Sequence, residues 1–231
     1  QQGPFRPASL MRIKAGIDND GNLIAWDAAR AGADISPDTF RSLLPALYSW
    51  MGDGMIEGVA NLSEWYFEKF ATDESSTEGL FEDYDHPNTR VTHMTVDHEL
   101  PMTFWRSVGH SYTAFAKESM IDEMAEAAGM DEVAFRLQNT QNTPRLNNVI
   151  RVAGEQMAKM NPPEGHYLGF AAHHSFYTDV AEVAEVSVES GKIRVHRVTC
   201  VLDCGQAVNP DIVRAQMEGG VVYGLTAALY G

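Results

Sequence analysis

The chain has 231 residues, of which 44% are hydrophobic and 21% charged, a composition typical of a packed globular protein. Its 32 acidic residues against 17 Lys and Arg give a net charge of −15, which argues against nucleic acids and anionic membrane surfaces as partners. Cys200 and Cys204 are too few for a disulfide-stapled fold or a cysteine-ligated iron–sulfur cluster. The longest apolar stretch, residues 221–229, is too short for a membrane span. Because the chain starts at Gln1 and stops at Gly231 inside a predicted helix, we expect a fragment of a longer protein.

The N-terminal third shows strand periodicity on both sides of a turn. Apolar and polar residues alternate over 8–33, and Asp18 to Asn22 supplies turn residues, which predicts a β-hairpin. A short helix is expected near Asp38 to Leu47, and residues 90–96 return to the period of a strand. The glycines that follow the helix are predicted to lie in a loop: Gly52, Gly54 and Gly58.

Residues 63–88 differ from the rest of the chain in composition. Eight acidic residues and one base, Lys69, lie between Glu64 and Asp85. Aromatic residues are mixed with them: Trp65, Tyr66, Phe67 and Phe70. One interpretation is a solvated insertion pinned to the surface by its aromatic residues. The other is a docking surface for a partner protein.

Helical patterns dominate the middle of the chain. One extends from Ser111, a predicted cap, to Gly129, which suits a helix end. A second begins at Asp131, and a third covers about residues 145–160 before two prolines.

Strands and a final helix follow. Residues 167–188 and 192–203 are predicted as strands joined by a turn at Ser190-Gly191, and a helix opens at Asn209. This mixture of helices and strands indicates a mixed α/β (α+β) fold.

The stretch from Phe104 to Ser111 lies where a strand or loop enters a helix. A helix start favours negative charge, Arg106 adds a cation, and Gly109 allows close approach to the backbone. These features suit an anionic or oxygen-rich cofactor, although an ordinary capped helix with a surface arginine gives the same pattern. On the same helix, Glu118 falls on the apolar face, where a carboxylate is costly unless it is paired. It is interpreted either as a structural hydrogen-bond partner or as a catalytic acid or base.

A second candidate region spans residues 203–220. Gln216 offers a donor and an acceptor to an oxo or pterin-type group. Gly219 and Gly220 destabilise a helix, which indicates either close helix packing or a bound group. The cysteines lack the spacing and further ligands of a metal site, so we interpret them as core residues and predict no metal ligands.

Several of these segments, in this order, resemble the molybdenum-binding large subunit of the xanthine dehydrogenase/aldehyde oxidase family, and most closely its isoquinoline 1-oxidoreductase beta-subunit type. The resemblance spans nearly the whole chain except the insertion at 63–88. The segments that carry it are 5–8 with the hairpin 11–26, 57–62, 105–123, 183–188 and 203–220.

The resemblance implies a fragment of two molybdopterin cofactor-binding domains, at 1–160 and 161–231. Members of the family hydroxylate aldehydes or electron-poor N-heterocycles with oxygen from water. Their electrons leave through an iron–sulfur small subunit or a cytochrome c subunit. The resemblance implies a location in either the bacterial cytoplasm or the periplasm and does not decide between them.

The resemblance also implies roles for single residues. Arg106, Ser107, Val108, Gly109 and Gln216 would bind molybdopterin, as its cytosine dinucleotide form, and Val108 would face the substrate. The family's catalytic glutamate lies in a Gly-x-Gly-Glu-Pro loop that this sequence lacks, so no catalytic residue is expected here and the chain alone should be inactive. Two alternatives stay open: a non-catalytic descendant that uses its acidic insertion as a protein-binding module, and a plain acidic binding module.

Overall fold

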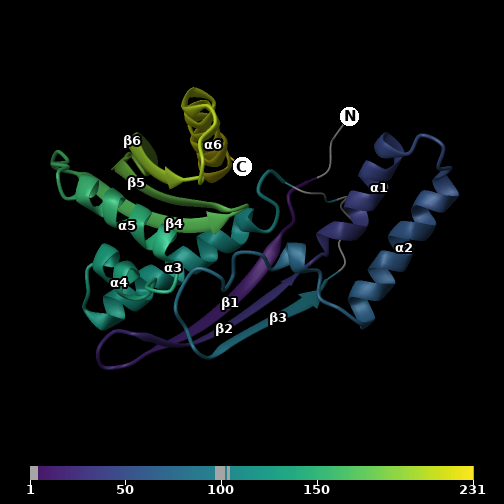
Figure 1. Cartoon of the computed structure of the whole chain (residues 1–231), viewed down its shortest axis with the longest axis horizontal. Helices are drawn as coiled ribbons and strands as arrows, with labels where there is room; N and C mark the ends of the chain where they lie inside the picture. Colours follow the sequence, from purple (N-terminus) through teal and green to yellow (C-terminus); the bar gives the residue numbers. More distant parts are fainter. Residues whose placement is uncertain (1–4, 97–101, 103–104, 231) are drawn as a thin grey trace. The chain divides into compact units, whose positions relative to one another are not determined.

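A computed structural model describes residues 5–96, 102 and 105–230 (Figure 1). Gln1, Phe104 and Gly231 lie outside the described residues. The chain forms two compact units. The first unit comprises Gln1–Glu82 with His86–Met124, and the second comprises Asp83–Asp85 with Ala125–Gly231.

The first unit contains a three-stranded sheet in the order β1-β2-β3 (Figure 1). β1 (Ser9–Ile17) and β2 (Leu23–Gly32) pair antiparallel, and β3 (Thr89–Thr95) pairs parallel to β2. The carboxylate of Asp18 accepts hydrogen bonds from two backbone amides of the turn, at 2.9 Å each. The predicted hairpin and the predicted third strand are therefore confirmed.

Two helices, α1 (Ile35–Leu47) and α2 (Asp53–Lys69), pack against each other in the first unit. The predicted short helix is confirmed and begins three residues earlier than expected. The loop predicted over three glycines is wrong, because the chain is helical there: Gly52 precedes α2, and Gly54 and Gly58 lie within it. Buried Ile56 and Ala60, one helical turn apart, give α2 a packed face that outweighs the low helix propensity of glycine.

The chain after α2 is only partly solvated. It contains a short 3-10 helix, η1 (Glu74–Ser76), and the side chains of several residues around it are buried: Asp73, Ser76, Thr77, Leu80, Asp83 and Tyr84. The indole N–H of Trp26 in β2 donates to the carbonyl of Leu80 at 2.8 Å. The solvated-insertion interpretation is therefore wrong for the buried positions around η1, whereas Glu74, Phe81 and Glu82 are exposed.

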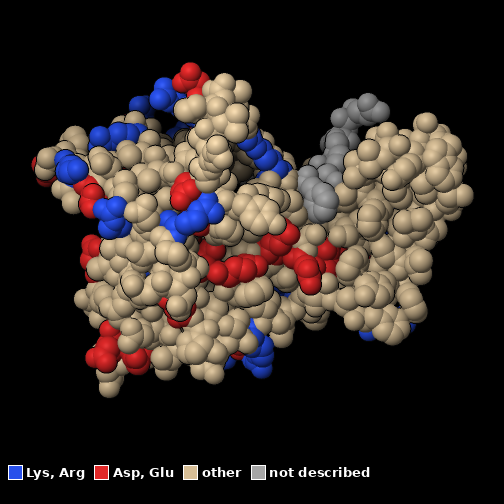
Figure 2. All heavy atoms as spheres, viewed as in Figure 1, with Lys and Arg blue, Asp and Glu red and all other residues tan. Residues whose placement is uncertain are grey.

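The helices α1 and α2 expose many large apolar side chains. Seven of these lie on the helices themselves: Leu43, Leu47, Met55, Val59, Leu62, Trp65 and Tyr66. Three more are exposed in the flanking segments, at Tyr48, Trp50 and Phe70. Figure 2 shows almost no charged side chains on the face of these two helices turned to the viewer. The docking interpretation, which concerns the acidic insertion at 63–88, stays a prediction.

α3 (His110–Ala128) confirms the long helix predicted in the middle of the chain. Ser111 does not cap it, because this residue lies inside the first turn and its hydroxyl donates to the carbonyl of Val108 at 2.9 Å. The predicted end is right, since Gly129 takes the left-handed conformation with φ of 64°.

The next two helices, α4 (Glu132–Gln138) and α5 (Pro144–Met157), also follow the prediction. Asp131 caps α4, and its carboxylate accepts from the amides of Val133 and Ala134 at 3.0 Å. α5 packs against the second sheet through a shared apolar cluster: Leu146, Val149, Ile150, Ala153, Phe170, Ala172, Ala181 and Val183.

The second sheet is an antiparallel meander of β4 (His166–Ser175), β5 (Thr178–Glu189) and β6 (Lys192–Asp203). The single strand predicted over 167–188 is wrong, because the chain reverses at Phe176 and Tyr177. Both take left-handed conformations, with φ of 47° and 62°, which a two-residue hairpin requires. Large aromatic residues are typical of strands rather than of such turns, so the local residue pattern contains no turn signal.

The turn predicted at Ser190-Gly191 joins β5 to β6, and the last helix, α6 (Pro210–Tyr230), begins as predicted. The side chain of Asn209 accepts from the first amides of α6 at 3.1 and 3.2 Å. No described residue of α6 is buried. Among the residues that the structure describes, no helix is long and apolar enough to cross a membrane.

Candidate functional site

The first half of the predicted site is the candidate turn, residues Trp105–Gly109, which leads into α3. The amide of Val108 donates to the carbonyl of Trp105 at 2.8 Å and closes the turn. Ser107 and Val108 both have positive φ, at 79° and 54°. This conformation is costly for a β-branched residue, and such strain is concentrated at ligand-binding sites.

The side chains of the candidate turn suit an anionic or oxygen-rich group. Arg106 and Ser107 are exposed, and Val108 is half-buried. The turn precedes the N-terminus of a 19-residue helix, where the helix dipole favours negative charge. An exposed guanidinium beside a helix start is a donor set that fits phosphate and oxo groups.

Gly109 has a structural reason for being glycine. It is buried, and a Cβ there would lie closer than 3.0 Å to the carbonyl oxygen of Ser75. The glycine therefore lets the turn pack on the chain around η1. The predicted approach of a cofactor to this backbone stays a prediction.

The support segment, residues 73–78, holds the start of α3 from outside the helix. The Tyr112 hydroxyl donates to the carbonyl of Ser76 at 3.1 Å. The Thr113 hydroxyl lies 2.5 Å from the carbonyl of Glu78 and 3.0 Å from that of Gly109. These contacts join segments 35 and 36 residues apart in sequence, so local patterns could not predict them.

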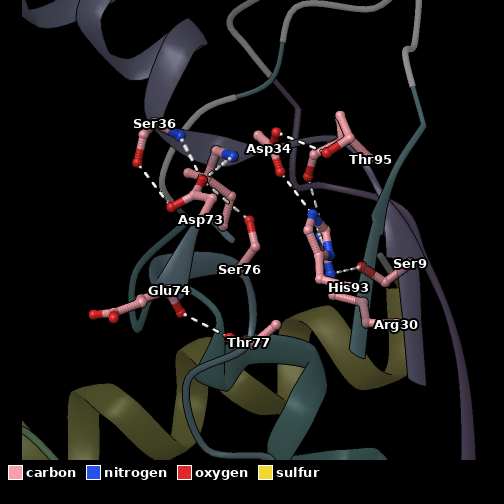
Figure 3. Close-up of polar contacts among 12 residues, drawn as sticks. Ser9, Arg30, Asp34, Ser36, Asp73, Glu74, Ser76, Thr77, His93 and Thr95 are labelled. Carbon is pink, nitrogen blue, oxygen red and sulfur yellow. Dashed lines mark hydrogen bonds and ion pairs between the residues drawn. The ribbon is translucent and has the colours of Figure 1, made fainter. Parts of the chain in front are cut away.

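The support segment is itself tied to α1 through Asp73 (Figure 3). Its carboxylate accepts from the amides of Ile35 and Ser36 at 2.8 and 3.0 Å. It also accepts from the hydroxyls of Ser36 and Ser76, at 3.0 and 3.2 Å. A buried carboxylate at the helix start thus satisfies amides that the helix leaves unpaired.

A buried arginine lies below Tyr112. The Arg30 side chain donates to the hydroxyl of Ser9 and the carbonyl of Ala33, both at 3.0 Å. Its guanidinium carbon lies 5.1 Å from the centre of the Tyr112 ring, a cation–π geometry. Burial lowers the pKa of Arg30, whereas the neighbouring Tyr112 and two carboxylates raise it.

His93 connects Arg30 to a second buried acid (Figure 3). One ring nitrogen lies 3.1 Å from the guanidinium of Arg30, and the other lies 2.6 Å from the carboxylate of Asp34. Thr95 donates to the same carboxylate at 3.0 Å. This network was not predicted from the sequence. The feature that could have indicated it is an arginine, Arg30, at a buried position of β2.

The second half of the predicted site begins where β6 ends. Asp203 accepts from the amide of Gly205 at 2.8 Å. Arg145 in α5 binds both carboxylate oxygens of Asp203, at 2.9 and 3.1 Å, and also donates to its carbonyl at 2.8 Å. The hydrogen bonds from Arg145 lower the pKa of Asp203 most, and the bond from the amide of Gly205 lowers it further. This contact of Arg145 with Asp203 was not predicted from the sequence.

Gln216 lies exposed on α6, in the second unit, whereas the candidate turn belongs to the first unit. A Cβ at Gly219 or Gly220 would meet no atom within 4 Å. Close packing of these glycines is therefore not found among the described residues. A bound group beside them stays a prediction.

An apolar cleft of about 680 Å³ lies between β6 and α6. The thiol of Cys200 lines it, and burial raises the pKa of that thiol to about 12. Burial also raises the pKa of its hydrogen-bond partner, Glu182. Both cysteines are free and half-buried, and no metal-binding group of residues occurs in the part of the chain that is described. Glu118 is buried in α3, and its catalytic role stays a prediction.

The fold is that of a mixed α/β protein. Residues 101–231 match the family model described as "Molybdopterin cofactor-binding domain". The chain therefore belongs to the molybdopterin cofactor-binding domain family, as the resemblance in its sequence indicated.

Individual relatives agree with this family. The chain is 30% identical over 237 residues to the beta subunit of isoquinoline 1-oxidoreductase from Brevundimonas diminuta, a match that covers 99% of this chain and 27% of that protein. It is also 30% identical over 248 residues to a subunit of nicotinate dehydrogenase from Pseudomonas putida, covering 98% and 19%. A solved aldehyde oxidoreductase from Desulfovibrio gigas aligns with 83% of this chain and 21% of that chain, at 18% identity and a TM-score of 0.47. The chain thus spans about a quarter or less of these proteins.

Proposed function

We propose that the chain is part of a molybdenum hydroxylase large subunit that oxidises aldehydes or N-heterocycles with oxygen from water. The observation that carries this proposal is the family match over 101–231, which includes the strained candidate turn. The relatives named for isoquinoline and nicotinate oxidation support the N-heterocycle class.

The residues present fit the cofactor. Arg106 would bind its anionic or oxo groups, with Ser107 and Gly109 shaping the turn, and Val108 would face the substrate. Gln216 would contribute a further donor and acceptor. The cofactor, when bound, supplies the two-electron oxidation, while the protein binds and orients it.

Finer features are also part of the proposal. The cofactor would be the cytosine dinucleotide form, held by domains that meet near residues 161–166. Electrons would pass to an iron–sulfur small subunit or a cytochrome c subunit. The relatives are named as subunits, which supports an assembly of several chains.

The test is metal and nucleotide analysis of the full-length protein and of two variants. We expect about one molybdenum per chain, release of CMP on acid hydrolysis, and a several-fold loss of both in Arg106→Ala. Arg151→Ala is the control, because this exposed arginine on α5 makes a surface ion pair with Glu155. Wild-type protein without molybdenum would refute the proposal, and full occupancy in Arg106→Ala would remove Arg106 from the site.

One observation favours the alternative, a non-catalytic protein-binding module. Residues 43–70 expose ten large apolar side chains, seven of them on α1 and α2, more than isolated surface residues explain. A metal-free wild-type protein that still bound another protein chain through the acidic insertion at 63–88 would support that function.

A further inference from the structure

The candidate turn is strained and needs to be held from outside. Ser107 and Val108 occupy the left-handed region, which non-glycine residues adopt only when the surrounding structure fixes them. The bond from the amide of Val108 to Trp105 closes the turn but does not anchor it to the unit. The anchoring must come from the neighbours of the turn.

Two hydroxyl groups in the first turn of α3 supply this anchor. Tyr112 and Thr113 donate to main-chain carbonyls of the support segment, at 3.1 and 2.5 Å. Both side chains are buried, and Thr113 is completely inaccessible to solvent. Since the same threonine hydroxyl lies 3.0 Å from the carbonyl of Gly109, it links the last residue of the candidate turn to the support segment.

The support segment is itself held by hydrogen bonds to α1. Asp73 fixes it to the start of α1 through backbone and side-chain hydrogen bonds of 2.8 to 3.2 Å. Its carbonyl at Ser75 also packs directly on Gly109. The support segment therefore accepts hydrogen bonds from the start of α3 through its carbonyl groups. Through the Asp73 carboxylate it accepts hydrogen bonds from the start of α1.

We propose that Tyr112 and Thr113 are positioning residues that hold the candidate turn in its cofactor-binding conformation, an inference that rests on the proposed function. They act through the carbonyl groups of Gly109 and the support segment and need not touch the cofactor. Loss of either hydroxyl leaves a buried carbonyl without its donor and loosens the turn. A loosened turn loses the pre-organised arrangement of Arg106 and the helix start.

The experiment compares full-length variants by molybdenum content and by hydrogen exchange over residues 105–109. We expect Thr113→Val to lose at least threefold in molybdenum content and to exchange at least tenfold faster in the turn. Thr113→Ser keeps the hydroxyl and should restore both values. The matched control is Thr39→Val, because the buried Thr39 makes the same kind of bond to a carbonyl one turn earlier, in α1.

Tyr112→Phe provides an independent variant that removes one oxygen atom and keeps the ring above Arg30. Should Thr113→Val fail to fold, this variant decides the matter, with the same expected direction in both measurements. Wild-type exchange and metal content in Tyr112→Phe would overturn the inference. If the wild-type protein contains no molybdenum, the proposed function fails, whereas hydrogen exchange still reports whether the two hydroxyls hold the turn.

Discussion

Replacement of Gly109 by alanine tests the packing between the candidate turn and the support segment. Glycine at this position does not have a positive φ, so alanine adds no backbone strain and the effect is purely steric. The added Cβ would lie closer than 3.0 Å to the carbonyl oxygen of Ser75, whereas ordinary contacts begin at 3.4 Å. The two backbones must therefore separate by several tenths of an ångström.

Such overpacking of a buried position costs about 1–3 kcal/mol in the free energy of unfolding. For a chain of this size that corresponds to a fall of about 2–12 °C in the melting temperature. The assay is thermal unfolding followed by circular dichroism, with Gly58→Ala as the control. Gly58 lies within α2 and a Cβ there meets nothing within 4 Å, so alanine should stabilise the helix by up to about 1 kcal/mol. A Gly109→Ala protein as stable as wild type would show that the two segments are not packed as described.

Three further changes test other parts of the structure. Asp73→Ala should lower the free energy of unfolding by about 3 kcal/mol, because it removes the charged acceptor of several buried donors. Replacement of its exposed neighbour, Glu74→Ala, should change this free energy by less than about 0.5 kcal/mol. Chemical denaturation measures both, and equal effects would contradict the anchoring role. Burial raises the pKa of Glu182 above its ordinary 4.5, so the folded chain binds more protons than the unfolded chain and loses stability as the pH rises through that folded-state pKa. Glu182→Gln should therefore be more stable than wild type at about pH 8 and lose this advantage at about pH 4. A difference in urea midpoint that does not depend on pH would argue against it. Replacing Phe176-Tyr177 by Asn-Gly should raise the melting temperature by relieving about 1 kcal/mol or more of left-handed strain. A lower melting temperature in thermal unfolding would contradict this.

Features set by neighbouring residues were predictable from the sequence. The side chains of Asp18, Asp131 and Asn209 each bond backbone amides within four residues, so the hairpin and two helix starts were found where the sequence placed them. The long helix in the middle of the chain was also predicted, although its start was placed at Ser111 instead of His110.

Features set by distant contacts were not predictable in the same way. The glycine-containing α2 is stabilised by its packed face, and the turn at Phe176 and Tyr177 follows from pairing of the two flanking strands. The burial of the support segment depends on partners 35 or more residues away. For the site, the sequence therefore predicted the candidate turn itself but not the residues that hold it.

The acidic composition and the proposed anionic cofactor are compatible because several of the acids are bound by partners close to them. Asp73 accepts amides at the start of α1, Asp34 binds His93, and Asp203 binds Arg145. These carboxylates act as structural ties within each unit and do not define the charge at the candidate turn. At the turn itself, Arg106 and the N-terminus of α3 favour a negative group. Glu78, whose side chain lies beside Gly109 and whose pKa is raised by burial and by nearby carboxylates, opposes it. A net charge of −15 therefore argues against extended polyanions, whose many charges sample the whole surface, while one small anionic group senses mainly its own site.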